Sequence, residues 1–384
     1  MMGPLLDILP PGSMVDQEAI GFRASGASVF ERIISADCHV TEPLDLWRRE
    51  LPPTLRARGP RLEVRDGRLG YVVEDRMAFK MPPLGGEPRP DGPLEIEMPG
   101  DNPATRAAAL ERDGVWGEVL YPQAGFFCTF EVEDPELQRG ICRVYNDWLA
   151  DTFGTDPRFA GIGLLPSLDR DACVAEMRRL AGLGLRGAML PAHSDECHYN
   201  EPIWEPVWEA AAGLGVPLHF HAGTGRTQRP IRGDGAAVVN YVVTVSGLIE
   251  TTSILCASGV LARHPDLRVG MVECGAGWLA WTLDSMDDAT RDHAAWVRPK
   301  LPEPPSQYFR RQGFVTFQRD PVGIANLART GARCLFWGSD YPHPEGTFPE
   351  SRDILAQQFE GVADDIARRI THDNAVETYR FPAA

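Results

Sequence analysis

The feature that most constrains the fold is an eightfold alternation of short apolar runs with longer stretches of helical character. The apolar runs predict strands at 32–39, 116–121, 159–165, 186–190, 217–221, 267–273, 313–317 and 334–339. Most of these runs are continuous, which is typical of parallel strands covered by helices on both faces. Eight such units favour a closed α/β fold, the (β/α)8 TIM barrel, over an open sheet. A dinucleotide-binding sheet is disfavoured because no Gly-x-Gly-x-x-Gly motif follows the first strand.

Two parts of the chain do not follow this repeat. Residues 1–31 lack periodicity and are predicted to form an N-terminal arm, so that the barrel occupies 32–384. Residues 48–100 are rich in proline, glycine and charge, with short alternating pieces between them. Such alternation is typical of β-hairpins, and we predict a hairpin-rich insertion after the first strand. Asp101-Asn102-Pro103 predicts the start of a helix that runs to about Asp113, because a capping residue precedes a proline in the first turn. The longest predicted helix covers 238–263, and a helix at 350–370 ends the repeat.

Charge and cysteine content limit the kinds of partner. The formal net charge of −16 argues against binding nucleic acid or an anionic membrane through bulk charge. None of the eight cysteines forms a Cys-x-x-Cys pair, so neither a disulfide framework nor a zinc knuckle is predicted. The N-terminus lacks a signal-peptide pattern, and no long uncharged apolar run is present. We therefore expect a cytoplasmic protein that acts on a small molecule.

Acids and histidines gather where the predicted strands end. In a barrel of this kind the active site lies at the carboxyl ends of the strands. The residues there are Asp37, His39, Tyr121, Gln123, His193, His219, His221, Glu273, Asp340 and, just beyond, His343. Scattered core histidines would not collect at one rim, so the pattern predicts a functional site.

The first strand offers a pair of metal ligands. Residues two apart share a face of a strand, so Asp37 and His39 point the same way. A strand-end acid with an incidental histidine is the structural alternative. Together with His221 and Asp340 they provide two imidazoles and two carboxylates, a donor set that suits zinc, manganese or iron. His219 shares a face with His221 and is expected to be a deeper hydrogen-bonding group or a substrate contact.

Other rim residues have several possible roles. Glu273 either caps the following helix, adds a metal ligand, or acts as a general acid or base on the substrate side of the metal. Tyr121, His193 and His343 are candidate substrate contacts. Arg226, on the loop after the fifth strand, is a candidate clamp for an anionic substrate, and a solvated position in an arginine-rich chain is the alternative.

Four motifs resemble the amidohydrolase superfamily. They are Asp-x-His-x-x-Glu-Pro at 37–43, His-Ala-Gly at 221–223, Gly-Ala-Gly-Trp at 275–278 and Gly-Ser-Asp-Tyr-Pro-His-Pro-Glu-Gly at 338–346. The resemblance covers roughly 33–375 and is strongest to amidohydrolase family 2, which includes aminocarboxymuconate-semialdehyde and γ-resorcylate decarboxylases. It implies a homodimer and one divalent metal ion, zinc in preference to manganese. The implied ligands are Asp37, His39, His221 and Asp340.

Two positions depart from the family pattern. The family often begins with His-x-His or Glu-x-His, so Asp37 leaves the preference for a metal open. Its decarboxylases usually carry a catalytic histidine where this chain has Glu273. Binuclear members of the superfamily bridge two metals with a carboxylated lysine on the fourth strand. The lysines of this chain are Lys80 and Lys300, neither on that strand, so a mononuclear site is predicted.

These observations predict a metal-dependent enzyme, and we favour non-oxidative decarboxylation of a small aromatic or enolisable carboxylic acid. Glu273 or Asp340 would deliver a proton to carbon, and a partly apolar pocket would raise the pKa of Glu273 enough for this task. The first alternative is hydrolysis of an amide, ester, lactone or C–C bond by metal-activated water, with Asp340 as the base. The second alternative is a metal-free barrel that binds a ligand.

Overall fold

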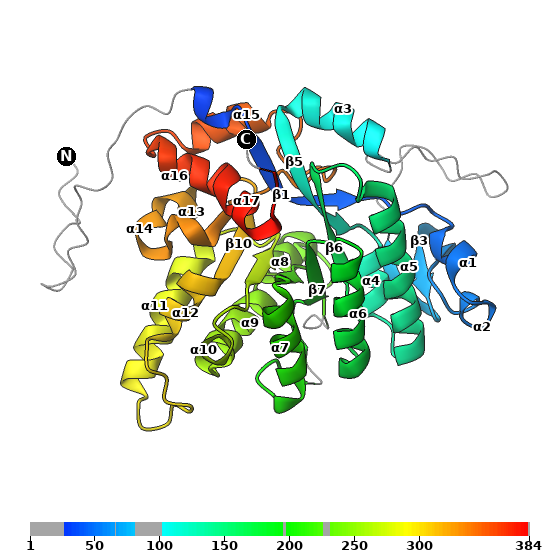
Figure 1. The fold of residues 1–384 in the computed structure, drawn as a ribbon, viewed down its shortest axis with the longest axis horizontal. Helices are drawn as coiled ribbons and strands as arrows, with labels where there is room; N and C mark the ends of the chain where they lie inside the picture. Colours follow the sequence, from blue (N-terminus) through cyan, green and yellow to red (C-terminus); the bar gives the residue numbers. More distant parts are fainter. Residues whose placement is uncertain (1–26, 66, 81–101, 195–196, 226–230, 383–384) are drawn as a thin grey trace, which may run out of the picture.

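The computed structural model describes residues 27–65, 67–80, 102–194, 197–225 and 231–382, and the fold is drawn in Figure 1. Its main sheet has eight parallel strands, which are β1 (Ile33–Val40), β5 (Val115–Pro122), β6 (Phe159–Leu164), β7 (Gly187–Pro191), β8 (Leu218–His221), β9 (Val269–Val272), β10 (Gly313–Phe317) and β11 (Leu335–Trp337). Neighbours in the sheet are neighbours in the chain. Most of the predicted arm lies outside the described residues.

The sheet closes on itself between β11 and β1. The Asp340 backbone N–H donates to the carbonyl of Asp37 (2.8 Å), and the N–H of His39 donates to the carbonyl of Tyr341 (2.7 Å). All residues of β1 and β11 are buried, as expected for strands enclosed by other strands and helices. The predicted (β/α)8 barrel is therefore confirmed.

Helices surround the barrel or cover its ends. They are α1 (Leu46–Glu50), α2 (Pro53–Arg56), α3 (Pro103–Asp113), α4 (Gly125–Phe130), α5 (Pro135–Phe153), α6 (Arg170–Gly182), α7 (Glu205–Leu214), α8 (Ala236–Val243), α9 (Ser246–Ala257), α10 (Val260–Arg263), α11 (Gly277–Asp292), α12 (Pro305–Gln312), α13 (Pro321–Ala325), α14 (Leu327–Thr330), α15 (Ser351–Gln358), α16 (Asp364–Arg368) and α17 (Asn374–Tyr379). A π-helical turn, Arg369–Asp373, joins the last two.

Local sequence explains where α3 begins and ends. The side chain of Asn102 accepts hydrogen bonds from the N–H groups of Ala104 and Thr105, while Pro103 occupies the first turn, where no backbone donor is needed. Gly114 ends the helix with a φ of 72°, a conformation that glycine adopts without a steric penalty. The helix predicted from this signal is confirmed.

The prediction of a single helix at 238–263 is wrong. The chain forms three helices there, α8, α9 and α10, and Gly259, with a φ of 80°, separates α9 from α10. By length and composition the stretch Ala236–Ala257 can span a membrane, although it is two helices and one of them, α9, packs against the barrel through Leu248 and Leu255. The helix predicted at 350–370 is also divided, because α15 and α16 are separate.

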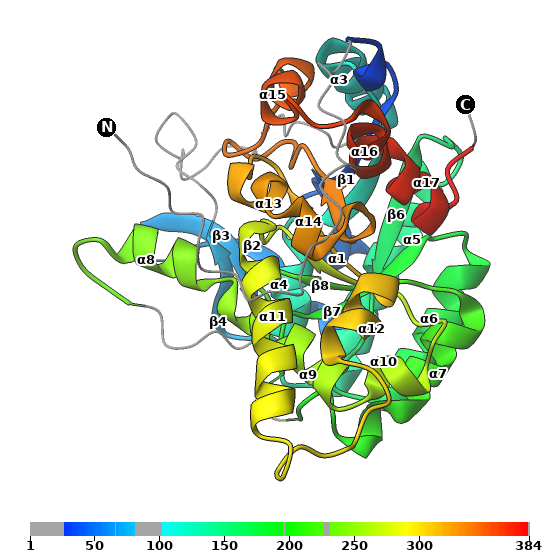
Figure 2. The same cartoon turned by 90° about the vertical axis from the view of Figure 1, so that its left-hand side faces the viewer.

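A second, smaller sheet lies within the predicted insertion. Three antiparallel strands form it, β2 (Arg61–Arg65), β3 (Arg68–Val73) and β4 (Arg76–Lys80). The ring of Phe79 on β4 stacks on Phe127 of α4 with a centroid distance of 5.0 Å, which joins this sheet to the barrel. Figure 2 shows that the small sheet and α8 project from the same side of the barrel.

Candidate metal centre

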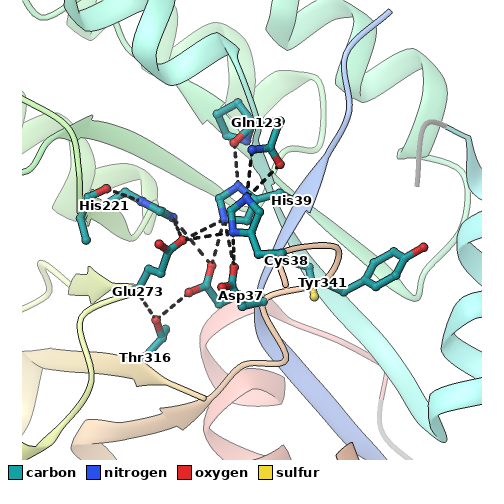
Figure 3. Close-up of polar contacts among 12 residues, drawn as sticks. Asp37, Cys38, His39, Gln123, His221, Glu273, Thr316 and Tyr341 are labelled. Carbon is teal, nitrogen blue, oxygen red and sulfur yellow. Dashed lines mark hydrogen bonds and ion pairs between the residues drawn. The ribbon is translucent and has the colours of Figure 1, made fainter. Parts of the chain in front are cut away.

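Four side chains from three strand ends converge at the carboxyl end of the barrel. Asp37 and His39 belong to β1, His221 to β8, and Glu273 directly follows β9; their ligand atoms all lie within 4.8 Å of one another (Figure 3). Oδ1 of Asp37 is 3.9 Å from Nε2 of His39 and 3.8 Å from Nε2 of His221. Oε2 of Glu273 is 3.2 and 3.4 Å from the same nitrogens. Two ligands at ~2.1 Å from one tetrahedral ion are ~3.4 Å apart, so this spacing suits a single cation.

Asp340 joins this group through His39. Its Oδ1 atom is 3.5 Å from Nε2 of His39, and it forms a second, overlapping cluster with His39, Glu273 and His343. The structure therefore brings all four predicted ligands to one place. It also puts Glu273 in both clusters, which makes this residue a fifth possible ligand.

Both imidazoles are oriented by backbone carbonyls. Nδ1 of His39 is 2.8 Å from the carbonyl oxygen of Pro122, and Nδ1 of His221 is 2.8 Å from that of Ala222. A carbonyl only accepts, so each Nδ1 carries the hydrogen and each Nε2 presents a lone pair to the centre. Histidine ligands of metals are typically held in this way.

Three buried atoms at the centre have no hydrogen-bond partner among the residues that the structure describes. They are Oδ1 of Asp37, Nε2 of His221 and Oδ2 of Asp340. Buried polar atoms are nearly always hydrogen-bonded, and an unsatisfied one needs an explanation such as an ion. Since these atoms are all electron-pair donors on residues of the two overlapping clusters, the residues present fit a divalent cation.

The pKa shifts of these residues in the protein without an ion also favour a cation at the centre. Burial, then the negative charges of Asp340 and Glu273, raises the pKa of Asp37 well above its usual value. Burial and Asp340 likewise raise the pKa of Glu273. Burial lowers the pKa of His221 to about 3, which keeps its imidazole neutral and able to bind a metal. A cation would relieve the repulsion among the carboxylates.

Two of these residues have a strained backbone. Glu273 has a φ of 54° and Asp340 a φ of 58°, in the left-handed region that side chains other than glycine rarely adopt. Such a conformation costs ~1–3 kcal/mol and collects at functional sites. Hydrogen bonds hold both residues, one from the Glu273 N–H to Oγ1 of Thr316 (2.7 Å) and one from the Asp340 N–H to the Asp37 carbonyl (2.8 Å).

Sequence reasoning missed two supporting residues. Thr316 on β10 donates from Oγ1 to Oδ2 of Asp37 (3.0 Å) while it accepts from Glu273, and Figure 3 shows it between the two. A hydroxyl within an otherwise apolar strand was the available signal. Glu42 accepts hydrogen bonds from three successive N–H groups at the start of α4, from Gln123 to Gly125. Its place in the motif at 37–43 was the signal.

Helix α4 was itself not predicted, and it supplies an aromatic side to the centre. The ring of Phe126 stacks on the imidazole of His221 at 5.0 Å, and Phe127 packs on Phe126 at 4.2 Å. Phe126 is buried, whereas Phe127 is half-buried beneath the small sheet. Ring contacts therefore run without a break from the insertion through α4 to His221.

The predicted substrate contacts lie in different places. Nδ1 of His343 donates to Oδ1 of Asp340 at 2.8 Å, and Nε2 of His343 lies beside the side-chain amide of Gln123. Tyr121 and His219 are fully buried beneath His221, with ring distances of 5.4 Å for Tyr121–His221 and 5.6 Å for Tyr121–His219. This arrangement suits the deeper supporting role for His219.

His193 and Arg226 are not part of the ligand cluster. His193 lines a separate cavity of about 430 Å³, together with Arg76 and Glu131. Arg226 lies outside the described residues, so its proposed contact with substrate stays a prediction.

Comparison with known proteins identifies the family. A family model described as Amidohydrolase matches residues 86–381. The chain belongs to the amidohydrolase family. The match begins after β1, so Asp37 and His39 lie outside the matched part of this amidohydrolase. Their position beside His221 and Glu273 comes from the structure alone.

Two curated relatives are decarboxylases. This amidohydrolase is 27% identical to γ-resorcylate decarboxylase of Rhodococcus jostii over 237 residues, which cover 54% of this chain and 68% of the relative. It is 37% identical to decarboxylase orsB of Emericella nidulans over 167 residues, 40% of this chain and 50% of the relative. The second match therefore spans only half of that protein.

A solved structure supports the fold. Dihydroxybenzoic acid decarboxylase from Polaromonas, with bound manganese and the inhibitor 2-nitroresorcinol, superposes with a TM-score of 0.61 at 19% identity. The alignment covers 92% of this chain and 98% of that one. At this level of identity the likeness concerns the barrel itself.

Proposed function

We propose that this amidohydrolase catalyses non-oxidative decarboxylation of a small aromatic or enolisable carboxylic acid. The observation that carries the proposal is that Asp37, His221 and Asp340 gather around Glu273, each with a buried ligand atom that has no hydrogen-bond partner among the described residues. Both curated relatives are named decarboxylases, and the manganese-bound solved structure is one as well. These names support the carboxy-lyase reaction over hydrolysis.

Asp37, His39, His221 and Asp340 would hold the cation, with Glu273 at or next to it. When bound, a divalent cation supplies a Lewis acid that binds the substrate carboxylate with an adjacent oxygen and offsets negative charge. We retain zinc as the proposed ion and manganese as the alternative. The predicted set of ligands has two carboxylates, and the structure adds that of Glu273. Because oxygen ligands suit manganese, a third carboxylate makes this ion a stronger alternative.

Glu273 is the proposed proton donor. In the reaction the bond between ring carbon and carboxyl carbon breaks, carbon dioxide leaves, and the electron pair remaining on the ring carbon takes up a proton. Glu273 keeps 22% of its side chain exposed, whereas Asp340 is fully buried. In the protein without an ion, burial also raises the pKa of Glu273, which favours its protonated form.

The experiment combines elemental analysis with measurement of carbon dioxide release. Wild type is expected to contain about one zinc or manganese ion per chain and to release carbon dioxide from a panel of hydroxybenzoic acids. Glu273→Gln keeps the size of the side chain but cannot deliver the proton. We expect it to lose ~100-fold or more in kcat, in line with typical acid–base contributions.

Two outcomes would contradict the proposal. Wild type without bound metal, even after growth with added zinc or manganese, would favour a metal-free binding barrel. A metal-loaded enzyme that hydrolyses amides or lactones and leaves every acid intact would favour the hydrolase. Light scattering of the same preparation tests the proposed homodimer.

A further inference from the structure

We propose that Arg106 is a positioning residue that fixes the two backbone segments carrying metal ligands, and so sets how tightly the centre binds its cation. The proposal rests on the metal centre of the proposed function, and it is independent of which reaction that centre catalyses. Arg106 reaches this centre through backbone carbonyl groups. It acts through the backbone of His39 and Tyr341.

Arg106 is held rigidly behind the centre. It lies on α3 and is fully buried, an uncommon position for a guanidinium unless it is paired. Its Nε donates to Oε2 of Glu118 on β5 at 2.5 Å, and Glu118 is itself buried. The ion pair ties α3 to β5, the strand next to β1 in the sheet.

The same guanidinium spans the closure of the barrel. Nη1 donates to the carbonyl of His39 at 2.6 Å, and Nη2 lies 3.5 Å from the carbonyl of Tyr341. That second carbonyl also accepts the N–H of His39. Since Tyr341 directly follows Asp340, Arg106 contacts the backbone of one ligand and of the neighbour of another.

The polar side of β1 continues this support. Alternate residues of a strand face opposite sides, so Cys38 points away from its neighbours Asp37 and His39. Its Sγ lies 3.2 Å from Oε1 of Glu118 and 3.2 Å from Oγ of Ser339, the residue before Asp340. The ligands on one face of β1 are therefore backed on the other face by a network that includes the Arg106 ion pair.

Arginine is well suited to this task. Its planar guanidinium presents five donors in a fixed geometry, so it can bind a carboxylate and two carbonyls at once. Lysine keeps the charge but has a compact ammonium group on a flexible chain, and it cannot reproduce this fork. A residue with the wrong donor geometry would let the ends of β1 and β11 shift relative to one another.

The test compares cation affinity among variants of the full chain. Arg106→Lys retains the charge, and the double variant Arg106→Met with Glu118→Leu removes both charges without leaving one buried and unpaired. The control is Asn146→Leu, because Asn146 is an equally buried side chain that bonds the backbone of Leu164 on β6, two strands away from β1 in the sheet. Circular dichroism checks that each apo protein is folded.

Zinc and manganese dissociation constants are measured by competition with a chelator, and the absorption spectrum of the cobalt-substituted protein reports ligand geometry. We expect both Arg106 variants to bind each cation 10- to 100-fold more weakly, the range typical for residues that orient ligands, with an altered cobalt spectrum. Asn146→Leu should unfold at a lower temperature and keep the wild-type affinity and spectrum.

Equal affinity and identical cobalt spectra for wild type and the Arg106 variants would overturn the proposal. So would an equal loss of affinity in Asn146→Leu, because the effect would then reflect general destabilisation. Failure of wild type to release carbon dioxide would overturn the proposed reaction alone, since the affinities are measured without substrate.

Discussion

At the scale of single residues, Thr316 shows how one hydroxyl organises two parts of the centre. It donates to Oδ2 of Asp37 and accepts from the N–H of Glu273, so its proton position is determined by both partners. This leaves Oδ1 of Asp37 directed at the centre without a partner among the described residues. Thr316 therefore orients a predicted ligand and supports the strained backbone of Glu273.

Replacing Thr316 with valine should impair both stability and metal binding. Valine has nearly the same shape but leaves a buried carboxylate oxygen and a buried N–H without partners, which costs ~1–3 kcal/mol in the free energy of unfolding. We expect about tenfold weaker metal binding as well. Thr316→Ser keeps the hydroxyl and serves as the matched control. Equal metal affinity of the valine and serine variants would contradict this role.

At the scale of elements, the closure between β11 and β1 depends on a glycine. A Cβ atom added to Gly338 would lie 2.5 Å from Cβ of Asp37 and 2.9 Å from its backbone nitrogen. Contacts this short force the strands apart, because the backbone of β1 cannot rotate away as a long side chain can. The glycine in the motif at 338–346 thus allows the two ligand-bearing segments to touch.

Gly338→Ala is expected to weaken metal binding at least tenfold and to cost ~1–3 kcal/mol of stability, the usual effect of overpacking a buried position. The control is Gly213→Ala in α7, where an added Cβ would meet no atom within 4 Å. That change should stabilise the protein by ~0.4–1 kcal/mol, because alanine restricts the unfolded chain. Thermal unfolding and chelator competition measure the two effects. An unaltered metal affinity in Gly338→Ala would show that the closure tolerates the extra methyl group.

At the scale of the whole molecule, the stability of the barrel is coupled to the charge of its centre. Asp37 and Glu273 have raised pKa values in the protein without an ion, because burial and neighbouring carboxylates disfavour their ionisation. Unfolded carboxyl groups titrate near pH 4. From about that pH up to the raised folded values, these two carboxyl groups bind more protons in the folded state than in the unfolded state, so their contribution to stability falls as pH rises.

Metal removal should therefore destabilise the protein more at pH 7.5 than at pH 5. A cation at 100 times its dissociation constant adds about 2.7 kcal/mol to the free energy of unfolding, and carboxylates bind it better once deprotonated. Asp340 does not change the direction of this pH dependence. Burial would raise the pKa of Asp340, but its contacts with His343 and His39 lower that pKa instead, so Asp340 is already ionised in this range. Unfolding temperatures with and without chelator at the two pH values measure the difference, and an equal shift at both would contradict the coupling.

Much of the fold followed from local patterns. Continuous apolar runs predicted β10 at its observed bounds, Gly313–Phe317, and the Asn102–Pro103 signal predicted the start of α3. The long helix at 238–263 was predicted wrongly, because apolar composition there hides the break at Gly259. Hydrophobic periodicity and helix capping depend on residues that are close together in the chain, so the sequence alone can predict them.

The candidate centre was likewise predictable only in part. Motif and strand period are local, and they already indicated that Asp37, His39, His221 and Asp340 stand near the ends of strands. The folding of the barrel brings Glu273 against both imidazoles. It also brings Thr316 and Arg106 behind the centre, because their contacts join segments far apart in the chain. Such contacts depend on the closure of the barrel, and no local pattern of residues encodes a distance across it.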